Sequence, residues 1–231
     1  MLTFQEPRLS DEAPCPYLSG RRARFEYFFA AGLDAGELDG LISAGWRKFG
    51  IYYFRPSCPG CESCVPLRVP VAGFRPSKGQ RRVIRKNIRT EARFGPLSYR
   101  PEVYSIYREH SLARFGRGED LEDFLSNFYR ESCPALQSEY YEGGRLMAVG
   151  FLDRSSGGLS SVYFVFRTEF ARNSPGIYSV IREIELAASL GLPYYYLGYC
   201  VEGCPRMEYK AEFRPFERYS WRESRWLGPE G

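Results

Sequence analysis

The chain has 231 residues, of which 44% are hydrophobic, and its formal net charge is +4. This length and apolar content predict a globule with its own core. No stretch approaches the twenty apolar residues of a membrane-spanning helix, and residues 1–14 carry charges where a secretory signal would be apolar. We therefore expect a cytoplasmic protein that makes no use of a membrane.

The first half of the chain alternates short apolar segments with polar loops. The expected elements are a helix at 37–44, strands at 50–54 and 65–71, a helix that begins after Gly79, and helices at 101–115 and 119–130. A loop that contains three cysteines separates the two strands. We expect residues 1–130 to form an N-terminal region that is both cysteine-containing and basic.

The second half changes to β-rich sequence. Segments 136–141, 145–152 and 159–166 are rich in Val, Tyr and Phe and are separated by glycine-containing turns, which predicts an antiparallel meander. Ser174 and Pro175 are typical of a helix start, Gly191 of a helix end, and a strand is expected at 193–199.

Three strands, a helix and a further strand are the core order of the GCN5-related N-acetyltransferase fold. We therefore expect an α+β protein in which residues 131–231 form an acyltransferase-like domain, with a mixed sheet and flanking helices, beside a small cysteine-containing layer.

The positive charge is concentrated in one segment. Residues 75–93 hold eight basic side chains against the single acid Glu91, a density that suits a phosphate backbone. A solvated helix face is the alternative, although such a face normally carries counter-charges. The pattern favours a nucleic acid as partner. The residues proposed to bind it or another anionic substrate are Arg75, Lys78, Arg81, Arg82 and Arg85.

The cysteines suggest a metal site. Cys58, Cys61 and Cys64 lie within one loop, and Pro-Gly between the first two lets a pair of thiolates face one ion. Cys15 is the best candidate for a fourth ligand, and Cys200 with Cys204 is a weaker option. Such a set suits zinc or an iron–sulfur cluster, and buried reduced thiols are the alternative.

The sequence lacks the residues that several classes of enzyme require. The one histidine, His110, is expected on a helix surface, so a histidine-based triad is not indicated. The chain has no P-loop and no Rossmann glycine motif. Around Arg172 and Gly176 the pyrophosphate loop of acetyltransferases is incomplete, which argues against acetyl-CoA. We expect a reaction that uses a pre-activated substrate.

The chain resembles the bacterial aminoacyl-tRNA–protein transferases, relatives of the arginyl-tRNA–protein transferases. The motifs that carry the resemblance are Cys15-Pro-Tyr-Leu-Ser-Gly-Arg, Arg55-Pro-Ser-Cys-Pro-Gly-Cys-Glu-Ser-Cys, Phe74-Arg-Pro-Ser-Lys-Gly-Gln-Arg-Arg, Leu159-Ser-Ser-Val-Tyr-Phe, Gly176-Ile-Tyr-Ser-Val-Ile-Arg-Glu, Leu192-Pro-Tyr-Tyr-Tyr-Leu-Gly-Tyr and Met207-Glu-Tyr-Lys-Ala-Glu-Phe-Arg-Pro. They occur in family order over about residues 14–217.

The resemblance implies transfer of leucine, or in eukaryotic relatives arginine, from its tRNA to an N-terminal Asp or Glu, which creates a degradation signal. No cofactor is then required for transfer, and the partners are charged tRNA and acceptor proteins with acidic N-termini. The family motif places a lysine at Lys210, our strongest single site. Arg21 and Arg24 match basic family positions, and we propose them, with Arg75, as contacts to the acceptor carboxylate or tRNA. A surface or salt-bridged arginine is the alternative for each.

Three tyrosines, Tyr163, Tyr178 and Tyr209, are phenol donors for the oxyanion or ribose, with aromatic core packing as the alternative. The chain departs from the family at residues 165–168, and it has Pro175 and Cys200 where relatives often carry Leu and Trp. These departures leave leucine as the favoured transferred residue, with arginine as the alternative. A relative that binds tRNA or metal without turnover is a further alternative.

Overall fold

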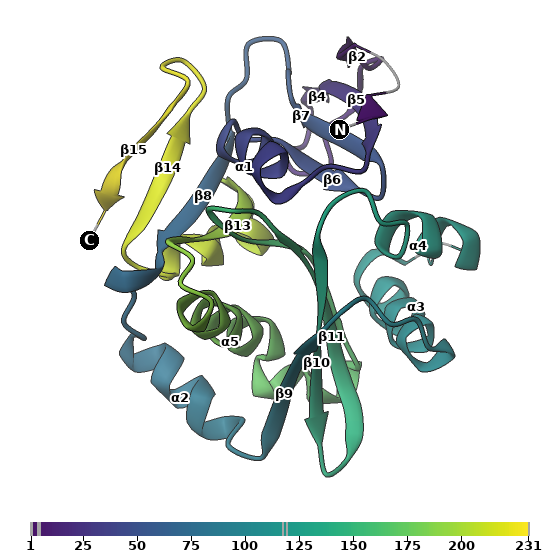
Figure 1. Cartoon of the computed structure of the whole chain (residues 1–231), viewed down its shortest axis with the longest axis vertical. Helices are drawn as coiled ribbons and strands as arrows, with labels where there is room; N and C mark the ends of the chain where they lie inside the picture. Colours follow the sequence, from purple (N-terminus) through teal and green to yellow (C-terminus); the bar gives the residue numbers. More distant parts are fainter. Residues whose placement is uncertain (1, 4–5, 117, 119, 231) are drawn as a thin grey trace.

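The computed structural model describes residues 2–3, 6–116, 118 and 120–230 (Figure 1). Position 119, the first residue of an expected helix, lies outside this set, as do positions 1 and 231. The strands are β1 (Leu2–Thr3), β2 (Arg8–Leu9), β3 (Ala13–Pro14), β4 (Arg22–Ala23), β5 (Phe25–Ala31), β6 (Arg47–Phe49), β7 (Tyr52–Pro56), β8 (Cys64–Pro70), β9 (Thr90–Gly95), β10 (Ala135–Glu142), β11 (Arg145–Arg154), β12 (Gly158–Phe166), β13 (Tyr194–Val201), β14 (Phe216–Ser220) and β15 (Arg225–Glu230). The helices are α1 (Ala35–Ser43), η1 (Val71–Gly73), α2 (Lys78–Lys86), α3 (Pro101–Phe115), α4 (Leu121–Phe128), η2 (Thr168–Asn173), α5 (Pro175–Ser189), α6 (Pro205–Glu208) and η3 (Tyr209–Glu212).

The centre of the molecule is an eight-stranded mixed sheet with the order β15-β14-β8-β13-β12-β11-β10-β9. The pairs β9/β10, β10/β11 and β11/β12 are antiparallel. Strands β12 and β13 are parallel and are connected through α5. The parallel pair is short, because only residues 158–160 of β12 register with 194–196 of β13. Beyond this point the two strands part, and β13 continues along β8.

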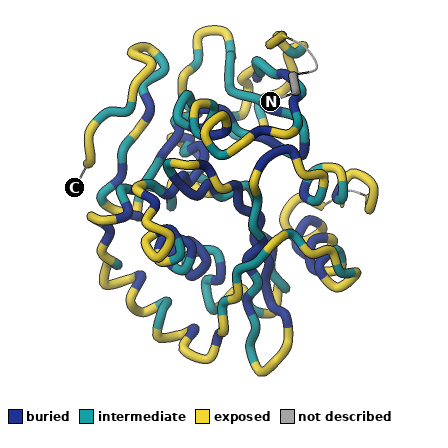
Figure 2. The backbone as a smooth tube through the Cα atoms, in the orientation of Figure 1, coloured by how far each residue is buried: buried dark blue, intermediate teal, exposed yellow. Residues whose placement is uncertain are grey.

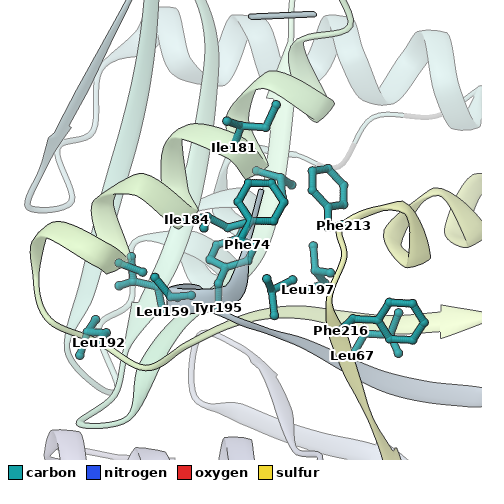
Figure 3. Close-up of a cluster of buried hydrophobic side chains, with 14 residues drawn as sticks. Leu67, Phe74, Leu159, Ile181, Ile184, Leu192, Tyr195, Leu197, Phe213 and Phe216 are labelled. Carbon is teal, nitrogen blue, oxygen red and sulfur yellow. The ribbon is translucent and has the colours of Figure 1, made fainter. Parts of the chain in front are cut away.

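Helices cover both faces of this sheet (Figure 1). Apolar residues of α5, among them Ile181 and Ile184, pack with Leu159 and Tyr195 of the sheet in the largest core cluster (Figure 3). On the opposite face, α3 and α4 pack on β11 and β12 through an aromatic cluster that includes Phe124 and Phe128. The deepest burial follows the central strands and the inner side of α5 (Figure 2).

A smaller sheet, in the order β1-β5-β7-β6 with β2 paired to β5, forms the N-terminal layer. Its attachment to the large sheet includes a buried ion pair in which Lys48 Nζ lies 3.1 Å from Asp153 Oδ1. The Tyr53 and Ser132 hydroxyls are hydrogen-bonded at 3.1 Å. Because both contacts are buried, the two layers pack as one unit.

The sequence-based predictions for the central elements are confirmed, including the meander, α5 and β13. Strand β9 and the hairpin of β14 and β15 were not predicted. The expected division at residue 130 does not separate two sheets, because β8 and β9 precede it and still belong to the large sheet. Ser174 precedes α5 as expected, but it adopts a left-handed conformation (φ 54°) and its side chain makes no capping hydrogen bond.

No helix in the described part of the chain is long and apolar enough to cross a membrane.

Candidate active site

Lys210 lies in η3, directly after the short helix α6 that follows β13. Its ammonium Nζ donates a hydrogen bond to the backbone carbonyl of Tyr199 at 2.7 Å. Burial, and then the positive charge of Arg47, lower the pKa of Lys210 to about 7. The side chain is therefore a fixed amine that changes protonation near neutral pH.

Arg47 is the functional candidate that the sequence analysis missed. It begins β6 of the small sheet, and its guanidinium donates to the Ser160 hydroxyl and the Ser161 carbonyl of β12. It also lies against Gly198, where an added Cβ would be 3.4 Å from the guanidinium carbon. Arg47 forms no ion pair with any acidic residue that the structure describes. The arginine thus brings a positive charge, outside any ion pair of the described residues, to the place where β12 and β13 part.

The three tyrosines are not brought together. Tyr209 adjoins Lys210 and packs edge-on against Phe213 at 6.5 Å. Tyr178 belongs to a core cluster, and its hydroxyl donates to the Thr90 carbonyl at 3.2 Å. Tyr163 stacks in the aromatic cluster under α3 and α4. The geometry therefore favours core packing for Tyr163 and Tyr178, and only Tyr209 lies beside the lysine.

An open hollow of about 560 Å³ lies near the same end of β13. Its walls come from the loop between β3 and β4, the cysteine loop, and the turn that follows β13. Besides Leu18, it is lined by Tyr17, Ser19, Arg21, Ser63, Glu202 and Gly203. Of the predicted substrate-binding residues, Arg21 is the one that lines it.

Arg24 and Arg75 already have protein partners. Arg24 donates to the Ser57 carbonyl at 3.0 Å, and Arg75 donates to the Phe74 carbonyl at 2.7 Å. Neither residue lines the hollow.

The cysteines gather beside the hollow. The Cys15 sulfur accepts a hydrogen bond from the Leu18 amide, and the Cys58 sulfur accepts one from the Arg24 amide, both at 3.4 Å. Burial, followed by the charges of neighbouring cysteines, raises the pKa of Cys64 to about 12. Among the residues that the structure describes, no group of three or more acidic, cysteine or histidine side chains is arranged to hold a metal.

The basic segment contains α2, whose N-terminus is closed by a capping box between Ser77 and Gln80. The predicted residues Lys78, Arg81, Arg82 and Arg85 are all exposed on it. None of them forms an ion pair with an acidic residue in the described ranges. Beneath this basic face, the buried Gln80 donates from Nε2 to the Glu212 carbonyl at 3.1 Å. The basic helix is thereby joined to the turn that carries Lys210.

Two further residues have surroundings that their sequence context did not indicate. His110 is buried rather than exposed, because its ring packs edge-on against Phe166 at 4.6 Å, and burial lowers its pKa. Arg167, in the segment that departs from the family, is 3.0 Å from Glu102 and 3.7 Å from Glu109 of α3. Its charge is therefore neutralised locally.

Comparison with known proteins gives a consistent result along the chain. Family models described as the N terminus and the C terminus of arginine-tRNA-protein transferase match residues 13–82 and 102–220. An aspartate/glutamate leucyltransferase from Chromobacterium violaceum is 36% identical over 88% of this chain and 86% of its own length. Those from Thiobacillus denitrificans and Alkalilimnicola ehrlichii are also 36% identical, over 90% and 94% of this chain and 89% and 92% of their own lengths.

Solved structures give weaker matches. L-PGS from Bacillus licheniformis has a TM-score of 0.43 at 15% identity, covering 61% of this chain and 48% of that one. FemX has a TM-score of 0.47 at 10% identity, covering 72% of this chain and 60% of that one. Scores below 0.5 do not assign a fold.

Proposed function

Because the chain belongs to the arginine-tRNA-protein transferase family, we propose that it is an aspartate/glutamate leucyltransferase. It takes leucine from leucyl-tRNA and attaches it to the N-terminal Asp or Glu of an acceptor protein. Charged tRNA and such acceptors are its partners, and the cytoplasm, where charged tRNA occurs, is its compartment. The leucylated N-terminus then serves as a degradation signal.

The observation that carries this proposal is the hydrogen bond between Gln80 and the Glu212 carbonyl. It joins an exposed basic helix, suited to a phosphate backbone, to the turn that carries Lys210. A tRNA acceptor stem bound to α2 would thus contact a helix that is hydrogen-bonded to the turn of Lys210. This arrangement positions an ester at the end of a nucleic acid rather than a free cofactor.

The reaction needs little acid–base machinery. An α-amine has a pKa of about 7.7–8.0, so a useful fraction of it is neutral at cellular pH. The neutral nitrogen attacks the ester carbonyl carbon, a C–N bond forms, and the ester C–O bond breaks. The nitrogen loses its extra proton, and the leaving ribose oxygen takes one up. The ester supplies the driving force, so we propose that no cofactor is required.

We propose that Lys210 stabilises the oxyanion of the tetrahedral intermediate. An ammonium group has three donors, and the Tyr199 carbonyl takes one of them. The remaining donors, with the charge of Arg47 close by, favour an anion at this point. Tyr209 is adjacent to Lys210 in the chain, and we propose that its phenol donates a hydrogen bond to the ribose oxygen.

The acyltransferase-like fold is likewise a proposal. Strands β10, β11 and β12 form an antiparallel meander, and α5 leads to the parallel strand β13, as in the GCN5-related N-acetyltransferases. The separation of β12 from β13 after residue 160 supports this assignment.

We also propose that Cys15, Cys58, Cys61 and Cys64 bind zinc or an iron–sulfur cluster. The proposal is supported by the donor type and the loop spacing, and no step of transfer passes through this group. Metal analysis and the visible spectrum of anaerobically purified protein, compared with the Cys58→Ser variant, provide the test. Bound zinc or iron that is lost in the variant supports the proposal, and metal-free wild type contradicts it.

The experiment for the function itself uses purified leucyl-tRNA and arginyl-tRNA in parallel, each with a labelled amino acid. Acceptors are one protein made with N-terminal Asp, Glu or Ala. Leucine on the Asp and Glu forms alone supports the proposal. Arginine on those forms would favour the arginyl alternative, and binding of tRNA without transfer would favour a non-catalytic relative.

A further inference from the structure

The open hollow beside β13 has a charge pattern that the transfer chemistry alone does not explain. It carries one cation, Arg21, and one anion, Glu202, together with the hydroxyls of Tyr17, Ser19 and Ser63. Arg21 and Glu202 form no ion pair with each other or with any other residue in the described ranges. Two opposite charges that share one hollow and remain apart can both be satisfied by a single ligand that carries both signs.

Arg21 differs from the neighbouring arginines in that it has no carboxylate partner among the described residues. Arg22 and Arg24 both face Glu12, at 3.8 Å and 4.0 Å. The side chain of Arg21 instead donates to the Cys61 sulfur at 3.4 Å, which leaves most of its five N–H donors available. The charge of Arg21 is therefore the one in this loop that no carboxylate of the described chain neutralises.

Hydrogen bonds hold the walls of the hollow in place. The loop is closed at its base by the Cys15 amide, which donates to the Arg21 carbonyl at 2.9 Å. On the other wall, the Gly203 amide donates to Glu208 Oε1 at 2.8 Å. Gly203 has a φ of +81°, and a Cβ there would lie 3.6 Å from Leu18. The opposed walls are thus in near contact at this glycine, and both charged residues extend from fixed backbone.

The hollow is continuous with the reaction centre along the chain. Tyr199, whose carbonyl accepts from Lys210, lies three residues before Glu202 at the end of β13. Cys204 directly precedes α6, which leads into the turn of Lys210. A ligand whose amine contacts Glu202 is therefore held three residues along the chain from the carbonyl that Lys210 binds.

We propose that this hollow binds the free N-terminal residue of the acceptor protein, with Arg21 on its side-chain carboxylate and Glu202 on its α-ammonium group. An N-terminal Asp or Glu is the peptide end that presents a cation and an anion a few bonds apart. The pairing with Glu202 requires an unblocked N-terminus, and the pairing with Arg21 requires an acidic side chain. This assignment rests on the proposed function, which it deepens by adding Glu202 as a specificity residue.

The test measures binding without tRNA, so that it is independent of transfer. Fluorescent peptides that begin with Asp, Asn or N-acetyl-Asp are titrated with the full chain and followed by anisotropy. For the wild type we expect the Asp peptide to bind about tenfold or more tightly than either of the other two, since the loss of each charge-assisted hydrogen bond costs at least about 1.4 kcal/mol.

Each variant should abolish one preference. Arg21→Met should remove the preference for Asp over Asn and keep that for the free over the acetylated terminus, and Glu202→Gln should do the reverse. Arg22→Met and Glu62→Gln are the matched controls, because they remove charges of the same sign next to the hollow without lining it. Both tested residues are exposed, so we expect unchanged melting.

The two hypotheses fail differently. If Arg21→Met and Glu202→Gln keep both preferences while the wild type still leucylates Asp acceptors, the assignment of the hollow is wrong and the transfer function stands. If the wild type binds the Asp peptide with both preferences but transfers no amino acid, the proposed function fails and the binding site stands.

Discussion

The Nζ atom of Lys210 lies 2.7 Å from the backbone carbonyl oxygen of Tyr199, which fixes a half-buried amine at the end of the central strand β13. The carbonyl orients the amine, and the nearby charge of Arg47 opposes its protonation. The lysine is therefore positioned by the sheet and influenced electrostatically by the N-terminal layer.

Replacing Lys210 with methionine should reduce leucine transfer by about 100-fold or more, the usual cost of losing one oxyanion donor. The melting temperature should not fall, because methionine fills a similar volume and carries no charge to desolvate. Arg206→Met, an exposed change in the preceding helix, is the control. Full activity of the Lys210 variant would remove this residue from the mechanism.

The pH dependence of stability provides a separate test of Lys210. Its pKa is about 7 in the folded protein and 10.5 in the reference state, so the unfolded chain binds more protons between these values. The free energy of unfolding of the wild type should therefore rise from about pH 7 to about pH 10 relative to Lys210→Met. Urea denaturation of both proteins across this range measures the difference. A constant difference would contradict the lowered pKa.

Glu183 should show the opposite trend. This buried carboxyl accepts hydrogen bonds from Ser138, Tyr140 and Tyr195, yet burial raises its pKa from 4.5 to about 7. Between these values the unfolded chain releases its proton and the folded protein does not, so stability falls as the pH rises. The free energy of unfolding of Glu183→Gln should therefore rise relative to that of the wild type by up to about 3 kcal/mol as the pH increases from about 4.5 to about 7. If the stability of the two proteins depended on pH in the same way, the pKa of Glu183 would not be raised.

Charge reversal on α2 should weaken the binding of tRNA without affecting the binding of the acceptor protein. The triple variant Arg81→Glu, Arg82→Glu and Arg85→Glu should raise the KM for leucyl-tRNA and leave the KM for the acceptor protein unchanged. The salt dependence should also weaken, by about 0.7–0.9 in the log–log slope for each phosphate that the variant no longer binds. Arg225→Gln, in a hairpin where the arginine faces Glu223 at 2.6 Å, is the control. An unchanged KM for tRNA would place the nucleic acid elsewhere.

Gly198 tests the position of Arg47. Its φ of +77° is unfavourable for other residues, and a Cβ would lie in contact with the Arg47 guanidinium, 3.4 Å from its carbon. Gly198→Ala should cost about 1–3 kcal/mol of stability and also lower the rate of transfer. Gly228→Ala, where a Cβ has open space, should change neither. A fully active and stable Gly198→Ala protein would show that Arg47 need not be held there.

The sequence predicted the elements whose signals are local. Pro175 and the apolar stripe that follows it predicted α5, and the valine- and tyrosine-rich segments predicted β10 to β12. Strand β9 was missed because its sequence continues the basic segment, and only its pairing with β10 makes it a strand.

The candidate site could be predicted only in part. Lys210 was found through a family motif, and its partner is a backbone carbonyl, which leaves no sequence signal. Arg47 reaches Ser160 and Ser161 from a distant part of the chain, and nothing in the local sequence around it indicates that contact. Glu202 lines the hollow only because the turn after β13 lies opposite the loop of Arg21.

The most direct measurement of the central claim is intact-mass spectrometry of an Asp-initiated acceptor protein. The acceptor is incubated with this protein and an equimolar mixture of leucyl-tRNA and arginyl-tRNA, and an Ala-initiated acceptor serves as the control. Our account predicts that the Asp acceptor gains the mass of one leucine residue and the Ala acceptor gains nothing. An added arginine, addition to the Ala acceptor, or no addition by folded protein that binds tRNA would contradict it.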